Sequence, residues 1–308
     1  MTKGKSNCKL QTANCKLGGW LWLGLVLVLV LPGCFKLDSF LFDATKVTEY
    51  LNPADMDSSW HVRFIIPDSL VEPVTLTAPD GNRVYGFFVR QPADTNVTPE
   101  NEFTVIYNHG NGQNINRYWG RVELLWEMGY KVFIYDYEGY GKSEGAPSGD
   151  ACYADAEAAL NYVLARPDVV DSSVVYLGWS LGSFMACHLA ADIRHPRCLI
   201  LENPLASTSA LAEEGAVLAI PGTFVADADF DNEARIPLVG CRTIIIYGRK
   251  DDTAVPKRNA EVLLKEAQGW IPITARPVDS AGHSDLPEVM TYPEYERTVK
   301  AFVRGDTL

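Results

Sequence analysis

The sequence predicts an α/β fold: a doubly wound, mostly parallel sheet with antiparallel N-terminal strands and a small cap. From residue 103 onward, short and almost uninterrupted apolar runs alternate with helix-like segments, as in parallel strands that are buried on both faces. Before residue 103, two β-rich runs flank Pro79-Asp-Gly-Asn82. An Asp-Gly pair in that setting is a hairpin signal, so the body is expected to open with antiparallel strands.

The first 33 residues differ in composition from the rest of the 308. Four lysines precede or adjoin an apolar stretch over residues 17–31, which leads to Pro32-Gly-Cys34. This pattern indicates a bacterial lipoprotein signal over residues 1–33 with Cys34 lipidated. An uncleaved anchor is the alternative, although the stretch is shorter than the roughly 20 residues that a membrane span needs. Residues 34–59 are expected to be a linker or lead-in segment, and residues 60–308 the main domain.

Cleavage before Cys34 would place the chain in the bacterial cell envelope. Phe35 rather than aspartate follows the cysteine, so similarity to other lipoproteins favours the outer membrane, with the body facing the periplasm. The cleaved chain would hold 23 basic against 39 acidic residues. Such a surface repels phosphate backbones, which disfavours nucleic acid as a partner.

Four cysteines lie in the main domain, in apolar surroundings and without a CxxC or Cys/His metal spacing. Buried thiols are the expected state, with a disulfide as the alternative. The four are Cys152, Cys187, Cys198 and Cys241.

The expected elements follow in chain order. β-rich runs predict strands at 60–66, 74–77 and 84–89, and an apolar run predicts one at 103–107. Helix-spaced Trp119, Val122, Leu125 and Trp126 before Gly129 predict a helix over 116–128. The same reasoning predicts strands at 131–135, 174–177, 198–201, 243–247 and 273–278, and helices at 150–165, 181–192, 257–267 and 292–303.

Residues 203–240 interrupt the alternation of strands and helices, because they are rich in alanine and contain several glycines and prolines. They are expected either to form a short cap over the carboxyl edge of the sheet, where α/β proteins bind ligands, or to make an ordinary surface excursion.

Gly178-Trp-Ser-Leu-Gly182 stands between an apolar strand and a helix-like run. A strand that turns sharply through G-x-S-x-G into a helix raises the serine hydroxyl at the end of the sheet, and the glycines relieve steric crowding in the turn. Ser180 is therefore the candidate nucleophile.

A serine hydroxyl needs a base, and histidine suits that role near neutral pH. His61, His109, His188 and His195 are expected to be structural, because of their positions in a strand, a turn, a helix and a surface connection. His283 lies in the loop after the last apolar strand, so a doubly wound sheet brings it to the same edge as Ser180.

The third member must be a carboxylate that orients the imidazole. Counting from the end of strand 243–247 selects Asp251, whereas counting back from Val255-Pro256 selects Asp252. We prefer Asp251 because the strand fixes where the turn begins. Glu202 is a more distant alternative.

An oxyanion hole needs N–H donors aimed at the developing charge. The main-chain amides of Asn111, in the turn after strand 103–107, and of Leu181 are the candidates, although that turn could also be simply flexible. Dinucleotide binding is disfavoured, because the Gly139/Gly141 turn has Glu144 where the third glycine of the fingerprint would stand.

Four segments together carry a resemblance: Tyr-Asn-His-Gly-Asn at 107–111, Asp-Tyr-Glu-Gly-Tyr-Gly-Lys-Ser at 136–143, Gly-Trp-Ser-Leu-Gly at 178–182 and Gly-His-Ser-Asp at 282–285. Over residues 74–303 the chain resembles the α/β-hydrolase superfamily, and most of all its Bem46-like group with the ABHD13-like serine hydrolases. The resemblance implies a Ser180–Asp251–His283 triad with no metal and no organic cofactor. The start of the chain after Cys34 also resembles that of lipid-anchored members.

The leading functional hypothesis is a serine esterase or thioesterase that acts on a small-molecule acyl substrate. A peptidase or amidase would use the same chemistry. A lipid-anchored, non-catalytic binding protein on a hydrolase scaffold is the alternative from another class.

Overall fold

The computed structural model describes residues 41–51, 63, 65–93, 102–213 and 230–307. The chain divides into two compact units, residues 1–36 and 37–308, of which the first lies wholly outside the described residues. The predicted signal segment and Cys34 belong to this undescribed part of the chain, and His61 also lies outside the described residues.

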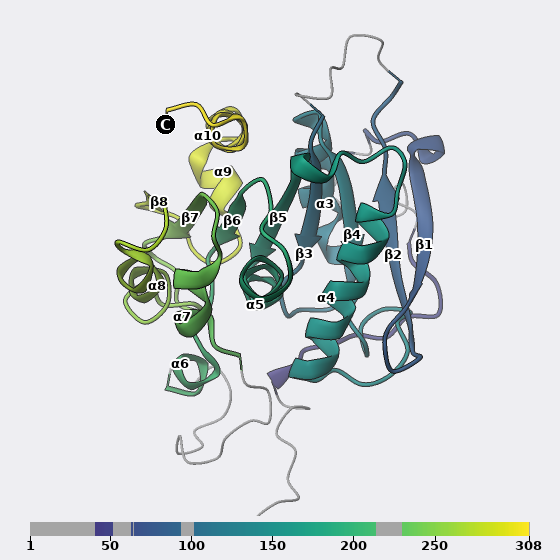
Figure 1. Ribbon diagram of the computed structural model, residues 1–308, viewed down its shortest axis with the longest axis horizontal. Coiled ribbons are helices and arrows are strands. Elements are labelled where there is room, and N and C mark those ends of the chain that lie inside the picture. Colours follow the sequence, from purple (N-terminus) through teal and green to yellow (C-terminus); the bar gives the residue numbers. More distant parts are fainter. Residues whose placement is uncertain (1–40, 52–62, 64, 94–101, 214–229, 308) are drawn as a thin grey trace, which may run out of the picture. The chain divides into compact units, whose positions relative to one another are not determined.

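A single sheet of eight strands forms the centre of the second unit, in the order β1-β2-β4-β3-β5-β6-β7-β8 (Figure 1). β1 pairs with β2, and β2 with β4, in antiparallel fashion, and every other pairing is parallel. The predicted fold class is thus confirmed. The strands are β1 (Val71–Thr77), β2 (Arg83–Val89), β3 (Thr104–Asn108), β4 (Lys131–Tyr135), β5 (Val174–Trp179), β6 (Leu199–Glu202), β7 (Thr243–Gly248) and β8 (Ile273–Val278).

Helices cover both faces of the sheet, with α4 and α5 on one face and α3 on the other (Figure 1). Local signals mark their ends: Asn114 and Ser148 cap α3 and α4 with their side chains, and Gly305 ends α10 at φ 97°. The helices are α3 (Ile115–Glu127), α4 (Gly149–Leu164), α5 (Gly182–His188), α6 (Thr208–Glu213), α7 (Asn232–Arg235), α8 (Ala260–Ala267), α9 (Leu286–Met290) and α10 (Tyr292–Arg304).

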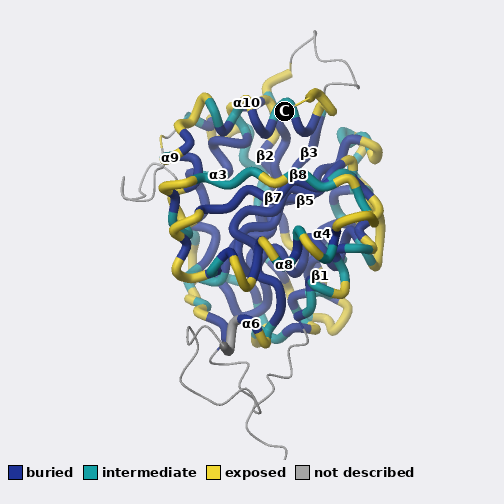
Figure 2. Tube along the Cα trace, turned by 90° about the vertical axis from the view of Figure 1, so that its left-hand side faces the viewer, coloured by how far each residue is buried: buried dark blue, intermediate teal, exposed yellow. Residues whose placement is uncertain are grey.

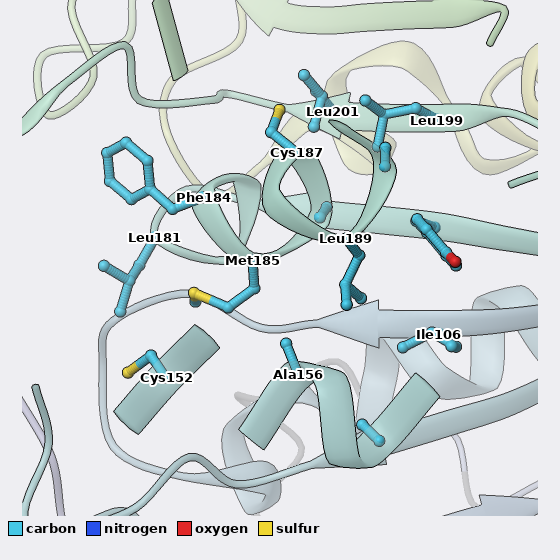
Figure 3. Packing of buried hydrophobic residues seen from close by; sticks show 14 of the residues in the cluster. Ile106, Cys152, Ala156, Leu181, Phe184, Met185, Cys187, Leu189, Leu199 and Leu201 are labelled. Carbon is cyan, nitrogen blue, oxygen red and sulfur yellow. The ribbon is translucent and has the colours of Figure 1, made fainter. Parts of the chain in front are cut away.

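Alternation along each strand divides the core into two layers. In β5, Val174 and Tyr176 face the layer of α4, α5 and α8, whereas Val175 and Leu177 face the layer of α3, α9 and α10. The central strands β3, β4, β5, β6 and β7 are buried along their whole length, whereas β8 at the edge of the sheet is only partly buried and the outer helix faces are exposed (Figure 2). Figure 3 shows the first layer, where side chains of α5 pack against α4 and the strands. This packing on both faces holds the strand ends, and hence the loops that follow them, in fixed positions.

The predicted strand over 60–66 is wrong for its described residues, since Arg63, Ile65 and Ile66 are not in a strand. Glu123 explains the difference. Its buried carboxylate accepts hydrogen bonds from the main-chain N–H groups of Arg63 (2.6 Å) and Ile65 (3.0 Å). These amides are satisfied by a side chain of α3, so the segment does not need a neighbouring strand.

The lead-in segment is part of the folded unit over residues 41–51. Leu41 and Phe42 are buried in the layer of α4 and α5. Two isolated β-bridges join Ala44 to Gln113 and Lys46 to Gly141. The segment therefore braces the two loops that follow β3 and β4.

Residues 203–240 contain α6, α7 and a 3₁₀ turn over Ile236–Leu238. A bridge between Ser207 and Asp231 closes the base of this excursion. Residues 214–229 are outside the described part of the chain, so the cap stays a prediction from the sequence.

Candidate active site

Ser180 sits in the sharp turn between β5 and α5 with φ at +54°. A non-glycine residue in this region stores roughly 1–3 kcal/mol of strain, which the surrounding structure must offset. The flanking glycines make the turn possible: a Cβ on Gly182 would lie 2.0 Å from the carbonyl oxygen of Asn108, and one on Gly178 would lie 2.6 Å from that of Gly182. The Ser180 N–H donates to the Glu202 carbonyl (3.0 Å), which ties the turn to the end of β6.

His283 connects Ser180 to a carboxylate. Its Nε2 lies 2.9 Å from Ser180 Oγ, and its Nδ1 lies 2.8 Å from Asp251 Oδ2. The three residues follow β5, β7 and β8, three strands whose carboxyl ends meet at one edge of the sheet. The tautomer that fits has Nδ1–H donating to Asp251, which leaves Nε2 free to accept the serine proton.

Of the two neighbouring carboxylates, Asp251 is the one in contact with His283. Asp251 is buried, and its other oxygen accepts hydrogen bonds from the N–H groups of Thr253 (2.9 Å) and Ala254 (2.8 Å). Asp252 is exposed. Glu202, the more distant alternative, is buried against Arg121 (2.6 Å) and the Tyr295 hydroxyl rather than against His283.

The loop after β3 passes close to the serine. A Cβ added to Gly110 would lie 3.5 Å from Ser180 Cβ. Asn111 is anchored by its side chain, because Oδ1 accepts from the Tyr140 hydroxyl (2.6 Å) and Nδ2 donates to the Leu41 carbonyl (2.7 Å). Among the described residues, the main-chain N–H groups of Asn111 and Leu181 donate to no protein acceptor. Both N–H groups are therefore candidates for an oxyanion hole.

The other described histidines are held by structural contacts. His109 is fully buried, stacks on Tyr118 at 4.7 Å between ring centroids and has Nε2 3.2 Å from Asp136 Oδ1. His188 bonds to Glu157 and Asp192, and His195 bonds to the carbonyls of Ala190 and Val239.

A cleft of about 340 Å³ lies beside the triad, between α3 and α9. Trp179 and Ser284, the chain neighbours of Ser180 and His283, form part of its wall. Three arginines also line it. Glu127 pairs with Arg63 (2.5 Å) and Glu202 with Arg121, whereas Arg117 has no carboxylate within 4.0 Å among the described residues. Glu288 lines the cleft as well, so charged groups of both signs border it.

The four body cysteines are free thiols and are buried, as the sequence predicted. Burial raises the pKa of Cys198 to about 12 and that of Cys241 to about 11, so these thiols stay protonated at neutral pH. In the described part of the chain, no cluster of three or more His, Cys, Asp or Glu side chains could bind a metal ion. None of the helices within the described ranges is both long and apolar enough to cross a bilayer.

Sequence reasoning missed one residue of the site, Asn203. It follows β6 directly, and its side chain donates to the carbonyl oxygen of His283 (2.7 Å). The only available signal was a polar residue immediately after an apolar strand at the carboxyl edge of the sheet.

Comparisons with known proteins agree with this architecture. A family described as the alpha/beta hydrolase fold matches residues 104–236. A protein of Escherichia coli K12 named "Uncharacterized protein YfhR" is 32% identical over 200 residues, which cover 64% of this chain and 68% of that protein. Human alpha/beta hydrolase domain-containing protein 17B is 31% identical over 230 residues, 72% of each chain.

Solved structures show the same fold. An esterase of Pyrococcus furiosus superposes with a TM-score of 0.67 and 17% identity, covering 86% of this chain and 97% of that one. An esterase of Exiguobacterium antarcticum superposes with a TM-score of 0.57 and 18% identity, covering 76% of this chain and 100% of its own.

Proposed function

The chain belongs to the α/β-hydrolase superfamily, and from this premise we propose that it is a serine hydrolase that cleaves an ester or thioester through an acyl-enzyme on Ser180. One observation carries the proposal: His283 lies 2.9 Å from Ser180 Oγ and 2.8 Å from Asp251 Oδ2. That chain of contacts is what a weak alcohol nucleophile needs in order to lose its proton at neutral pH.

In acylation, Ser180 Oγ attacks the carbonyl carbon of the substrate while its proton passes to His283 Nε2. Asp251 stabilises the imidazolium that forms, and the amides of Asn111 and Leu181 donate to the new oxyanion. Collapse of the tetrahedral intermediate expels the alcohol or thiol, which takes the proton from His283. Water then attacks the acyl-enzyme with His283 again as the base, and this step releases the acid and restores Ser180.

The cleft between α3 and α9 is the candidate site for the non-reacting part of the substrate. Trp179 connects its wall to the triad, because it precedes Ser180 in the chain and its Nε1 donates to the His283 carbonyl (3.1 Å). Arg121 lies over the Trp179 ring at 5.6 Å and donates to the Ser284 carbonyl. Among the charged groups of this lining, Arg117 is the cation without a carboxylate within 4.0 Å in the described residues, and it supports an ester with a carboxylate or phosphate at its far end.

The proposed identity extends to the Bem46-like group and to a lipid anchor on Cys34 at the bacterial outer membrane. The sequence pattern over residues 1–34 supports the anchor. After expression of the full chain in a Gram-negative host, Cys34 should be the N-terminal residue and carry acyl groups that mass spectrometry detects, and a Cys34→Ser variant should lack them. An unmodified Cys34 in the wild-type chain, or a wild-type N-terminus that still includes residues 1–33, would contradict the lipidation.

The activity is tested with short p-nitrophenyl esters. Ser180→Ala should lower kcat/KM by about 10³-fold or more, because the nucleophile of the proposed acyl-enzyme is lost. Ser172→Ala is the matched control: this exposed serine precedes the amino end of β5, so its removal should leave the rate within about 2-fold.

Turnover by Ser180→Ala at more than a tenth of the wild-type rate would refute the serine mechanism. A panel of esters, thioesters and anilides separates the candidate reactions. Faster cleavage of anilides than of matched esters would favour the peptidase or amidase alternative, and no turnover of any of them by folded protein would favour a non-catalytic binding protein.

A further inference from the structure

We propose that Asn203 is a positioning residue that holds the loops of the acid and the base at one geometry. The inference rests on the proposed function, since it concerns how the same triad is assembled. Asn203 touches none of the reacting atoms, so its effect must pass through the main chain of its neighbours.

The side chain of Asn203 bonds to both loops. Its Oδ1 accepts from the N–H of Gly248 (2.8 Å), the last residue of β7 and three positions before Asp251. Its Nδ2 donates to the carbonyls of Gly282 (3.0 Å) and His283 (2.7 Å). One carboxamide therefore links the start of the acid loop to the backbone of the base.

The main chain around Asn203 reaches the nucleophile. The carbonyl of Glu202, the preceding residue, accepts from the N–H of Ser180 (3.0 Å), and the N–H of Asn203 donates to the Ile246 carbonyl (2.9 Å). The segment 202–203 is thus hydrogen-bonded to the turn of Ser180, to β7 and to the loop of His283.

Asparagine fits this position for three reasons. It is 1% exposed, so each polar atom must be satisfied internally, and all of its side-chain capacity for donating is used. Its φ is +41°, in a left-handed region that asparagine tolerates better than most residues. Aspartate would keep the acceptor but has no N–H to donate, and its charge would face two carbonyl oxygens.

Other hydrogen bonds also hold the loops of Asp251 and His283, and they limit the expected effect of losing the Asn203 side chain. The N–H groups of Arg249 and Lys250 donate to the carbonyls of Val278 (3.0 Å) and Ala281 (2.9 Å). Trp179 Nε1 gives the His283 carbonyl a second donor. Loss of the Asn203 amide should therefore displace His283 without releasing its loop. A displacement of the order of 1 Å at a catalytic group costs about 10²-fold in rate.

The test compares Asn203→Asp and Asn203→Gly with the wild-type chain by stopped-flow labelling with a fluorophosphonate. Aspartate keeps the bond to Gly248, and glycine removes the side chain while accepting φ +41°. Both variants should label to completion at a rate constant about 10²-fold lower, with KM for a short ester changed by less than about 3-fold. Asn232→Asp is the matched control, because Asn232 is also buried and donates through Nδ2 to two acceptors, the Leu205 carbonyl and Ser183 Oγ, but does not contact the triad.

Labelling kinetics separate positioning from a loss of fold. If Asn203 only supports stability, part of each variant stays unlabelled and the rest reacts at the wild-type rate constant, which overturns the inference. A 10²-fold slower reaction of Asn232→Asp would also overturn it, because any buried charge would then have the effect. If the wild-type chain itself is not labelled, the proposed function fails, and the role of Asn203 fails with it.

Discussion

The choice between Asp251 and Asp252 gives the sharpest prediction about the mechanism. Asp251→Asn changes one atom without changing the size of the side chain. Its Oδ1 can still accept from Thr253 and Ala254, so the turn should keep its shape. The new NH₂ group, however, would face His283 Nδ1, which lies 2.8 Å from the present oxygen.

Two donors cannot face each other at this distance, so Nδ1 must give up its proton. The imidazole then carries its proton on Nε2, the nitrogen that must accept from Ser180, and loses the charge that stabilises its protonated form. The loss of both functions is worth about 10⁴-fold in kcat in serine hydrolases with this arrangement, or about 5.4 kcal/mol of transition-state stabilisation. Asp252→Asn, on the exposed neighbour, should change kcat by less than about 2-fold.

The assay is kcat for a short p-nitrophenyl ester at pH 7.5, with circular dichroism to confirm that both variants are folded. A larger loss in Asp252→Asn than in Asp251→Asn would reverse the assignment of the acid. More than a tenth of wild-type activity in Asp251→Asn would refute the argument from the imidazole tautomer.

Three further predictions concern other parts of the molecule. Burial raises the pKa of Asp155 from 3.8 to about 8, so between these values the folded state keeps a proton that the unfolded chain has lost. The free energy of unfolding should therefore fall from pH 4 to pH 8 by at most about 1.4 kcal/mol per pH unit. The gain in Tm from Asp155→Asn should be larger at pH 8 than at pH 5, and an equal gain at both would contradict this. Native protein treated with iodoacetamide at pH 8 should be unmodified at its four buried cysteines by mass spectrometry, and modification before unfolding would show that they are accessible. Arg117→Ala should raise KM about 10-fold for an ester with a terminal carboxylate and leave KM for its neutral methyl ester within about 2-fold; equal changes for both substrates would remove the anion-binding role of the cleft.

Much of the fold could be predicted because an uninterrupted apolar run in the sequence indicates a strand in the core. The apolar run 131–135 coincides with β4, which is buried throughout, and the run 273–278 coincides with β8, which lies at the partly buried edge of the sheet. Helix ends were predictable where a local signal exists, such as Gly129 after α3. The segment 60–66 was not, because its β-rich composition competes with a long-range contact: the Glu123 carboxylate lies about 60 positions away in the chain.

The sequence allowed two things about the candidate site to be predicted: which types of residue form it and which strands they follow. Ser180 and His283 each occupy a loop that the alternation of strands brings to one edge, and the structure places them in contact. Asp251 and Asp252 could not be separated from sequence, because the path of the turn, with the amides of Thr253 and Ala254 folded back on one carboxylate, decides which one faces the histidine. The role of Asn203 could not be predicted for a similar reason, since its hydrogen-bond partners Gly282 and His283 are 79 and 80 positions away in the chain.

The central claim is that Ser180 is an activated nucleophile, and peptide mapping after fluorophosphonate treatment tests it most directly. The account predicts a single covalent adduct on Ser180 in the wild-type chain, and none at the same exposure in a folded His283→Ala variant. An adduct on another residue, no adduct on folded wild-type protein, or equal labelling of His283→Ala would contradict it.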